Sequence, residues 1–138
     1  MKRRYLITID GLQMIGWNKN ITLSTLGDFK KDNDKYYISY NNYDENNNFD
    51  ITLLEIDADK KVSFTRNGNN ASHLVIERDQ KNYSHLRTDY GDAMLGIKAS
   101  RIRNDLNDSG GRLSLTYAMD MNANELFHSK LDITVKEL

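Results

Sequence analysis

The sequence predicts an all-β fold, a single antiparallel up-and-down β-barrel of about 8–10 strands with little or no helix. Apolar and polar residues alternate along most of the chain, as in strands with one buried face, and no window repeats with the period of a helix. Turn signals rich in Asn, Asp and Gly recur at short intervals. Because tight turns join antiparallel neighbours, this pattern favours a meander closed into a barrel over a Greek-key sandwich.

The first strands are predicted by alternating runs at residues 4–17, 21–29, 36–40, 51–56, 62–66 and 74–76. Gly11 marks a bend or bulge in the first of them. Between the third and fourth runs, residues 41–48 are almost all Asn, Asp and Glu. Such side chains compete with the backbone for hydrogen bonds and bury little, so we expect the longest and most mobile loop here.

The longest predicted hairpin joins two alternating runs, residues 83–90 and 93–106, at Gly91. In the second run the apolar parity changes between Ile97 and Ile102. One extra residue between them, a β-bulge, restores the phase. A long strand with a bulge is more typical of a closed, coiled sheet than of a flat one.

The C-terminal part predicts two more strands after a turn at residues 108–111. Residues 112–121 alternate most regularly, with leucines and methionines on one face. The last strand covers residues 127–136, and residues 124–130 form a possible turn of helix before it. The whole chain is therefore interpreted as strands and turns.

The composition indicates one domain, residues 1–138, in a reducing compartment. A formal net charge of −1, from 19 basic and 20 acidic residues, gives no electrostatic reason to expect nucleic acid or an anionic membrane as partner. The absence of Cys excludes disulfides, thiolate chemistry and cysteine zinc sites. Because Asp10 and Gly11 interrupt the apolar run after a basic start, we expect no signal peptide and a cytoplasmic location.

Several short motifs together resemble a known family. They are LITIDG at residues 6–11, KYYISY at 35–40, RNG at 66–68, TDYG at 88–91 and LDITVK at 131–136. In order and spacing they are similar to the YwiB-like family of small bacterial proteins, over nearly the whole chain. The resemblance implies a calycin-type, lipocalin-like β-barrel in a cytoplasmic protein of uncharacterised function. It brings no catalytic residue with it.

Arg66 is the ionisable group that the pattern places on an apolar face. It shares parity with Val62 and Phe64, which predicts that its guanidinium group faces the barrel interior. An unpaired buried charge is costly, so Arg66 needs a partner. In one interpretation it sits at the barrel mouth, partly hydrated, and pairs with an acidic side chain or with turn carbonyls.

In the other interpretation, Arg66 belongs to a ligand-binding site. Thr88, Tyr90 and Tyr117 have hydroxyl groups on inward parities. Together with Arg66 they are suited to bind the carboxylate or phosphate of a ligand through charge-assisted hydrogen bonds. This hypothesis needs no cofactor and no metal, and it makes the protein a non-enzymatic barrel for a small apolar or anionic ligand.

Two other classes of function stay open. Leu26 and Leu53 fall on the polar parity, which favours a protein-interaction module acting through an outer sheet face, as in a homodimer. An enzyme is suggested only by His85 and Asp89, which share a face. The three histidines lie on separate strands without metal-ligand spacing, and we expect no catalytic residue.

Overall fold

The computed structural model describes residues 4–12, 21–43, 46–67, 72–88 and 91–138. Its strands are β1 (Tyr5–Leu12), β2 (Ile21–Asp32), β3 (Lys35–Tyr43), β4 (Phe49–Asp57), β5 (Lys61–Arg66), β6 (Ser72–Glu77), β7 (Asn82–Thr88), β8 (Gly91–Asn107), β9 (Gly110–Met121) and β10 (Asn124–Glu137). None of these described residues forms a helix with the length and hydropathy that crossing a membrane would require.

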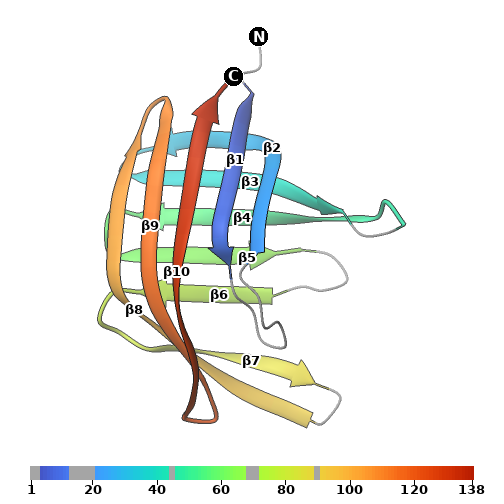
Figure 1. Ribbon diagram of the computed structural model, residues 1–138, viewed down its shortest axis with the longest axis vertical. Helices are drawn as coiled ribbons and strands as arrows, with labels where there is room; N and C mark the ends of the chain where they lie inside the picture. Colours follow the sequence, from blue (N-terminus) through green and yellow to red (C-terminus); the bar gives the residue numbers. More distant parts are fainter. Residues whose placement is uncertain (1–3, 13–20, 44–45, 68–71, 89–90) are drawn as a thin grey trace.

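The ten described strands form one antiparallel sheet that curls into a nearly closed barrel, as the sequence predicted. The order across the sheet is β6-β5-β4-β3-β2-β1-β10-β9-β8-β7. Strands that follow each other in the chain are therefore neighbours in the sheet, except β6 and β7. The strands β8, β9, β10 and β1 form one layer, and β3 to β6 cross it at a steep angle in a second layer (Figure 1).

The strand β2 connects the two layers by turning at Gly27. From residue 21 to residue 27 it pairs with β1, and from residue 27 to residue 32 it pairs with β3. A Cβ atom at Gly27 would overlap the Cδ1 atom of Ile7 and the carbonyl oxygen of Ser39. Glycine therefore lets the backbones approach closely where the strand changes layer.

The strands β6 and β7 follow each other in the chain but do not pair in the sheet. This departs from the expectation that successive runs are neighbours. Asp79, with a φ of 61°, turns the chain between them, and its backbone NH donates to the carbonyl of Ala99 on β8 at 2.9 Å. We call the junction between the edge strands β6 and β7 the seam. There, the Ser84 hydroxyl donates to the carbonyl of His73 at 3.0 Å.

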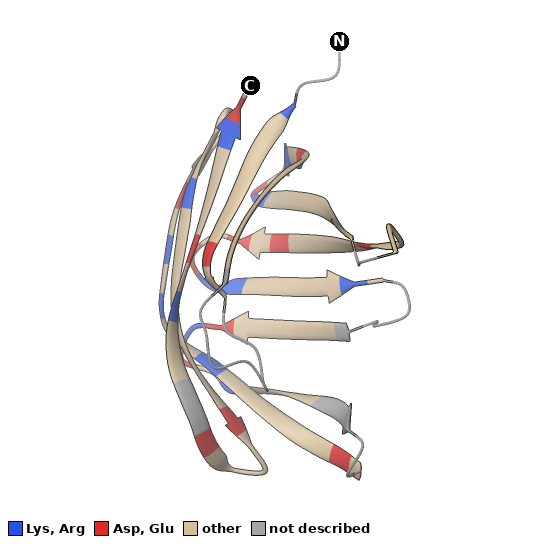
Figure 2. Ribbon diagram, turned by 45° about the vertical axis from the view of Figure 1, so that its right-hand side comes forward, with Lys and Arg blue, Asp and Glu red and all other residues tan. Residues whose placement is uncertain are grey.

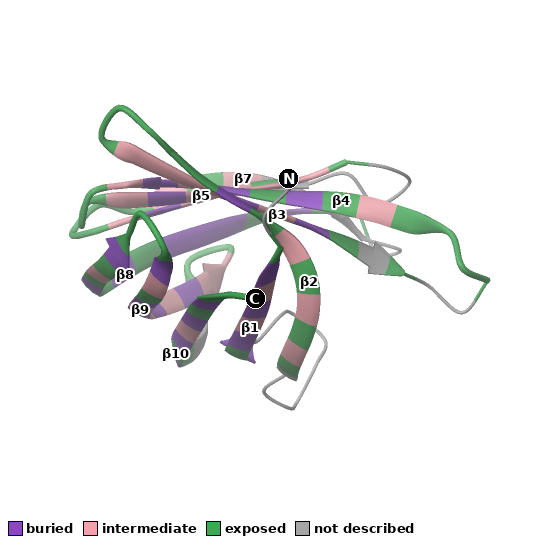
Figure 3. Cartoon of the chain, turned by 90° about the horizontal axis from the view of Figure 1, so that it is seen from above, coloured by how far each residue is buried: buried purple, intermediate pink, exposed green. Residues whose placement is uncertain are grey.

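The core lies between the two layers and follows the predicted alternation of faces. Buried positions alternate with exposed or intermediate ones along β1, β9 and β10 (Figure 3). The largest fully buried side chains are Ile7, Ile9, Ile38, Leu54, Ile56, Val62, Ile97, Leu113, Leu115, Leu131 and Ile133. Burying one such side chain contributes about 1.5–3 kcal/mol, so this shared interior holds the layers together.

Two predicted details of the long hairpin are confirmed. It consists of β7 and the 17-residue strand β8. The register of β8 against β9 shifts between Ala99 and Arg101, where the sequence predicted a bulge. As a result, Ile97 before the shift and Ile102 after it are both buried.

Two expectations about loops are wrong. Residues 124–130 form no helical turn, because Asn122 and Ala123 both have positive φ and reverse the chain directly into β10. The Asn-rich segment is also not a loop throughout, since β3 continues to Tyr43, whose ring lies 5.7 Å from that of Phe49.

Candidate functional site

A row of polar side chains crosses the inner face of the second layer. In the register Gly27 pairs with Tyr40, Tyr40 with Thr52, and Thr52 with Arg66. Tyr40 and Thr52 are 6% and 7% exposed. We call Tyr40, Thr52 and Arg66 the polar row. The polar row lies where β5 ends, at Arg66. Along β4, the next residue on the same face after Thr52 is Leu54, which belongs to the apolar core.

Arg66 reaches the inner face, with the guanidinium group partly in solvent. Its side chain is 33% exposed, and its Nε atom lies 3.5 Å from Oδ2 of Asp50, whose side chain is 16% exposed. This Nε atom is buried and makes no hydrogen bond within the described structure. Arg66 therefore has an acidic neighbour, as the first interpretation expected, and its Nε donor makes a long ion-pair contact but no hydrogen bond within the described structure.

Tyr40 supplies a protonated hydroxyl beside Arg66. Burial raises the pKa of the Tyr40 phenol, while a hydrogen bond with Thr52 and the positive charge of Arg66 act in the opposite direction. The phenol therefore stays neutral at physiological pH and can donate a hydrogen bond. Chemically, the row offers a guanidinium group and two hydroxyl groups next to one carboxylate.

The other predicted site residues lie elsewhere or outside the described structure. Tyr117 is buried on β9 in the first layer, opposite Ala99 of β8 and Ser129 of β10. The backbone of Thr88 pairs with Gly91, but its side chain, like Tyr90, lies outside the described residues. That these hydroxyl groups share a ligand with Arg66 stays a prediction.

Hollows open at two places on the described surface of the barrel, and Tyr40 of the polar row is among the residues that line one of them. One, of about 300 Å³, lies at the corner of β2, where Gly27 and Leu26 are among the residues that line it. The other, of about 350 Å³, lies on β8, β9 and β10. No group of three or more His, Cys, Asp or Glu side chains suited to a metal ion occurs among the described residues.

Residues 7–133 match the family described as a domain of unknown function, DUF1934. The chain belongs to the DUF1934 family. Among solved structures, the ywiB protein from Bacillus subtilis is similar, with a TM-score of 0.76, 18% identity, and coverage of 97% of this chain and 91% of that one. At this identity the likeness shows the fold alone. No curated protein matches the chain.

The resemblance to YwiB-like proteins is thus confirmed, and with it the barrel fold of this DUF1934 chain. Sequence reasoning missed Asp50, which follows the Asn-rich segment and was not counted as part of a strand. The available signal was parity, because Asp50 shares it with Thr52 and Leu54. Extending the strand pattern by one residue would have placed a carboxylate on the inner face near Arg66.

Proposed function

We propose that this DUF1934 protein binds a small ligand without chemical conversion, and that Arg66 holds the ligand's anionic group at the open end of the second layer. The observation that carries the proposal is the buried Nε atom of Arg66, which within the described structure makes no hydrogen bond and a contact of 3.5 Å with the carboxylate of Asp50. A buried donor without a partner costs about 1–3 kcal/mol. A ligand oxygen closer to Nε than that of Asp50 would recover part of that free energy.

The neighbouring residues favour an amphipathic ligand with a carboxylate. Phe64 is partly buried against the core and precedes Arg66 on the same face. An apolar chain packed along Phe64 would bring its carboxylate to Arg66 and to the hydroxyl of Tyr40. Asp50 competes for the same guanidinium group, but its contact at 3.5 Å is long for an ion pair, so the carboxylate of a ligand can replace it.

The test is a calorimetric titration with decanoate as the probe. We expect the Arg66→Met variant to bind at least tenfold more weakly, because it keeps the bulk of the side chain but removes the charge. Arg78→Met is the matched control, since Arg78 pairs with Asp59 at an exposed position and lies outside the polar row. Equal affinity in the wild type and Arg66→Met, or no binding to either, would exclude this function.

A second candidate function rests on a different surface. Five large apolar side chains are exposed on the outer face of β2, β3 and β4, namely Leu26, Tyr43, Phe49, Ile51 and Leu53. The register places Phe49 opposite Tyr43, and Ile51 opposite Asn41. We call these five residues the apolar face. Neighbouring exposed apolar side chains of this kind favour contact with a second copy of the chain.

Light scattering across protein concentrations tests the homodimer. We expect the mass to rise toward that of two chains, and Ile51→Lys to keep the protein monomeric because it buries a charge in the contact. Leu138→Lys is the control, since Leu138 is 65% exposed and lies outside the apolar face. A wild-type protein that stays monomeric at all concentrations would count against this function.

A further inference from the structure

A basic hollow lies on the outer face of β8, β9 and β10, away from the polar row. Seven residues line its volume of about 350 Å³, of which four are cationic, one is acidic and none is aromatic. Lys and Arg recur along this layer of the barrel (Figure 2). The cationic side chains are Arg101, Arg103, Arg112 and Lys130. We call this feature the basic hollow.

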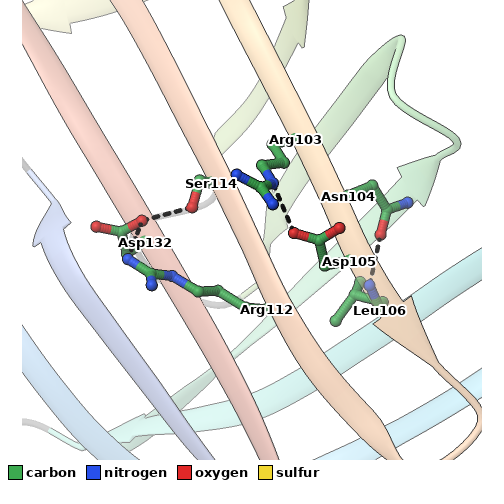
Figure 4. Close-up of polar contacts among 7 residues, drawn as sticks. All are labelled: Arg103, Asn104, Asp105, Leu106, Arg112, Ser114 and Asp132. Atoms are coloured by element: carbon green, nitrogen blue, oxygen red, sulfur yellow. Dashed lines mark hydrogen bonds and ion pairs between the residues drawn. The ribbon is translucent and has the colours of Figure 1, made fainter.

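Two of these cations already have carboxylate partners within the protein. Arg103 Nε lies 2.8 Å from Asp105 Oδ2, and Arg112 lies 3.0 Å from Asp132 Oδ1. Ser114 also donates to Asp132 at 2.6 Å, so Arg112 and Ser114 converge on one carboxylate (Figure 4). The side chain of Arg103 turns toward Asp105 on its own strand (Figure 4). These contacts leave little of their charge for a further ligand.

The other two cations, Arg101 and Lys130, lie on either side of the Thr116 hydroxyl group in the register. Arg101 pairs in the register with Thr116, and Thr116 with Lys130. Neither cation forms a close ion pair within the part of the chain that the structure describes, although the charge of Lys130 acts on Asp132. Since neighbouring strands lie about 4.8 Å apart, the Cα atoms of Arg101 and Lys130 are separated by roughly 10 Å, within reach of both long side chains.

We propose that the basic hollow binds a compact small molecule that carries two or more linked phosphate groups. The guanidinium group of Arg101 presents paired NH donors that match phosphate oxygens, and Lys130 adds a flexible point charge on the other side. The Thr116 hydroxyl lies between them and can donate to a bridging oxygen. Arg101 and Lys130 are both exposed, and their two positive charges match the negative charge of such a phosphate chain.

The same residues disfavour larger polyanions. Single-stranded nucleic acid is held by aromatic side chains on which bases stack, and the lining of the basic hollow has none. The formal net charge of −1 gives no long-range attraction for a long polyanion. Recognition is therefore local, through phosphate groups that fit between Arg101 and Lys130.

The experiment is a calorimetric titration of the full chain with sodium pyrophosphate at low ionic strength. We expect the double variant Arg101→Ala and Lys130→Ala to lose at least tenfold in affinity, because the two cations that flank Thr116 are gone. The control removes two exposed cations from other parts of the surface, Lys30→Ala and Lys60→Ala, and should bind as the wild type does. Circular dichroism checks that each variant is folded.

A gain-of-affinity variant makes the test sharper. Asp105→Asn removes the only carboxylate that lines the basic hollow, so pyrophosphate should bind severalfold more tightly. A nucleoside triphosphate and inorganic tripolyphosphate, titrated in parallel, distinguish a nucleotide from an inorganic phosphate chain as the source. No binding of pyrophosphate, equal loss in the control, or binding of an RNA oligonucleotide alone would overturn the proposal. Arg66→Met should leave this binding unchanged, which separates it from the proposed carboxylate site.

Discussion

Arg66 and Asp50 form an ion pair at the edge of the core, so substitutions in the candidate site also change the stability of the fold. Both side chains are partly removed from water, at 33% and 16% exposure. Removing one charge leaves the other less well compensated in a partly buried position. The pair therefore stabilises the folded state mainly by preventing an isolated charge.

A double-mutant cycle measures this coupling. We expect Arg66→Met and Asp50→Asn each to lower the free energy of unfolding by about 1–2 kcal/mol. The double variant should lose less than the sum, with a coupling of about 1 kcal/mol, because no isolated charge remains. Urea denaturation of the four proteins gives the values. Additive losses would show that the two side chains do not interact in solution.

Asp132 predicts a pH dependence of stability. The hydrogen bond from Ser114, followed by the bond and charge of Arg112, holds the pKa of this carboxyl below its ordinary value, although burial opposes them. Because the folded-state pKa is the lower one, the carboxylate stabilises the protein above the unfolded pKa of about 4. This stabilisation is lost as the pH falls through the folded pKa.

The variant Asp132→Asn tests that sign. We expect it to be less stable than the wild type by about 1 kcal/mol at pH 7, with a difference that shrinks as the pH falls below the unfolded pKa of about 4. Urea denaturation at several pH values measures it. Asp105→Asn is the control, because its pair with Arg103 is exposed and contributes little at any pH. A difference that grows on acidification would contradict the assignment.

At the scale of single strands, parity predicted faces well and boundaries less well. The change of parity between Ile97 and Ile102 was enough to predict the bulge, because only an inserted residue keeps both on the core side. The turn at Asn122 and Ala123 gave no comparable signal, since a two-residue hairpin turn is recognised chiefly by a glycine in its second position. Residues 124–130 were therefore open to a helical interpretation.

The corner of β2 carries a prediction about a single element. Replacing Gly27 by Ala adds a Cβ atom that overlaps the side chain of Ile7 and the backbone carbonyl of Ser39. Because a backbone atom cannot move without disturbing the pairing of β2 with β3, we expect a loss of about 1–3 kcal/mol in the free energy of unfolding. Asp28→Ala, at the exposed next position, should change it by less than about 0.5 kcal/mol. Similar values for both variants would mean that the corner has room for a methyl group.

For the whole molecule, the sequence predicted the curled antiparallel sheet but not its seam. Alternation assigns each side chain to a face, yet it does not choose the partner of a strand. The general expectation that tight turns join antiparallel neighbours also covers the short segment between β6 and β7. In the structure, Arg78 bridges to Ala99 of β8, so β6 and β7 diverge and both become edges of the sheet. The candidate site was likewise predicted only in part. Parity placed Arg66 on the inner face, but it did not identify Asp50 and Thr52 as its neighbours.

The seam makes hydrogen exchange uneven across the barrel. In the described structure, β6 pairs only with β5 and β7 only with β8, whereas β1 and β10 have strands on both sides. Edge amides that point away from the single partner strand have no ladder acceptor and exchange through small openings. We therefore expect peptides from β6 and β7 to take up deuterium first, and peptides from β1 and β10 last, in exchange followed by mass spectrometry. Equal protection of all four strands would mean that the seam is closed in solution, because the ladder of the sheet would then have to continue from β6 to β7.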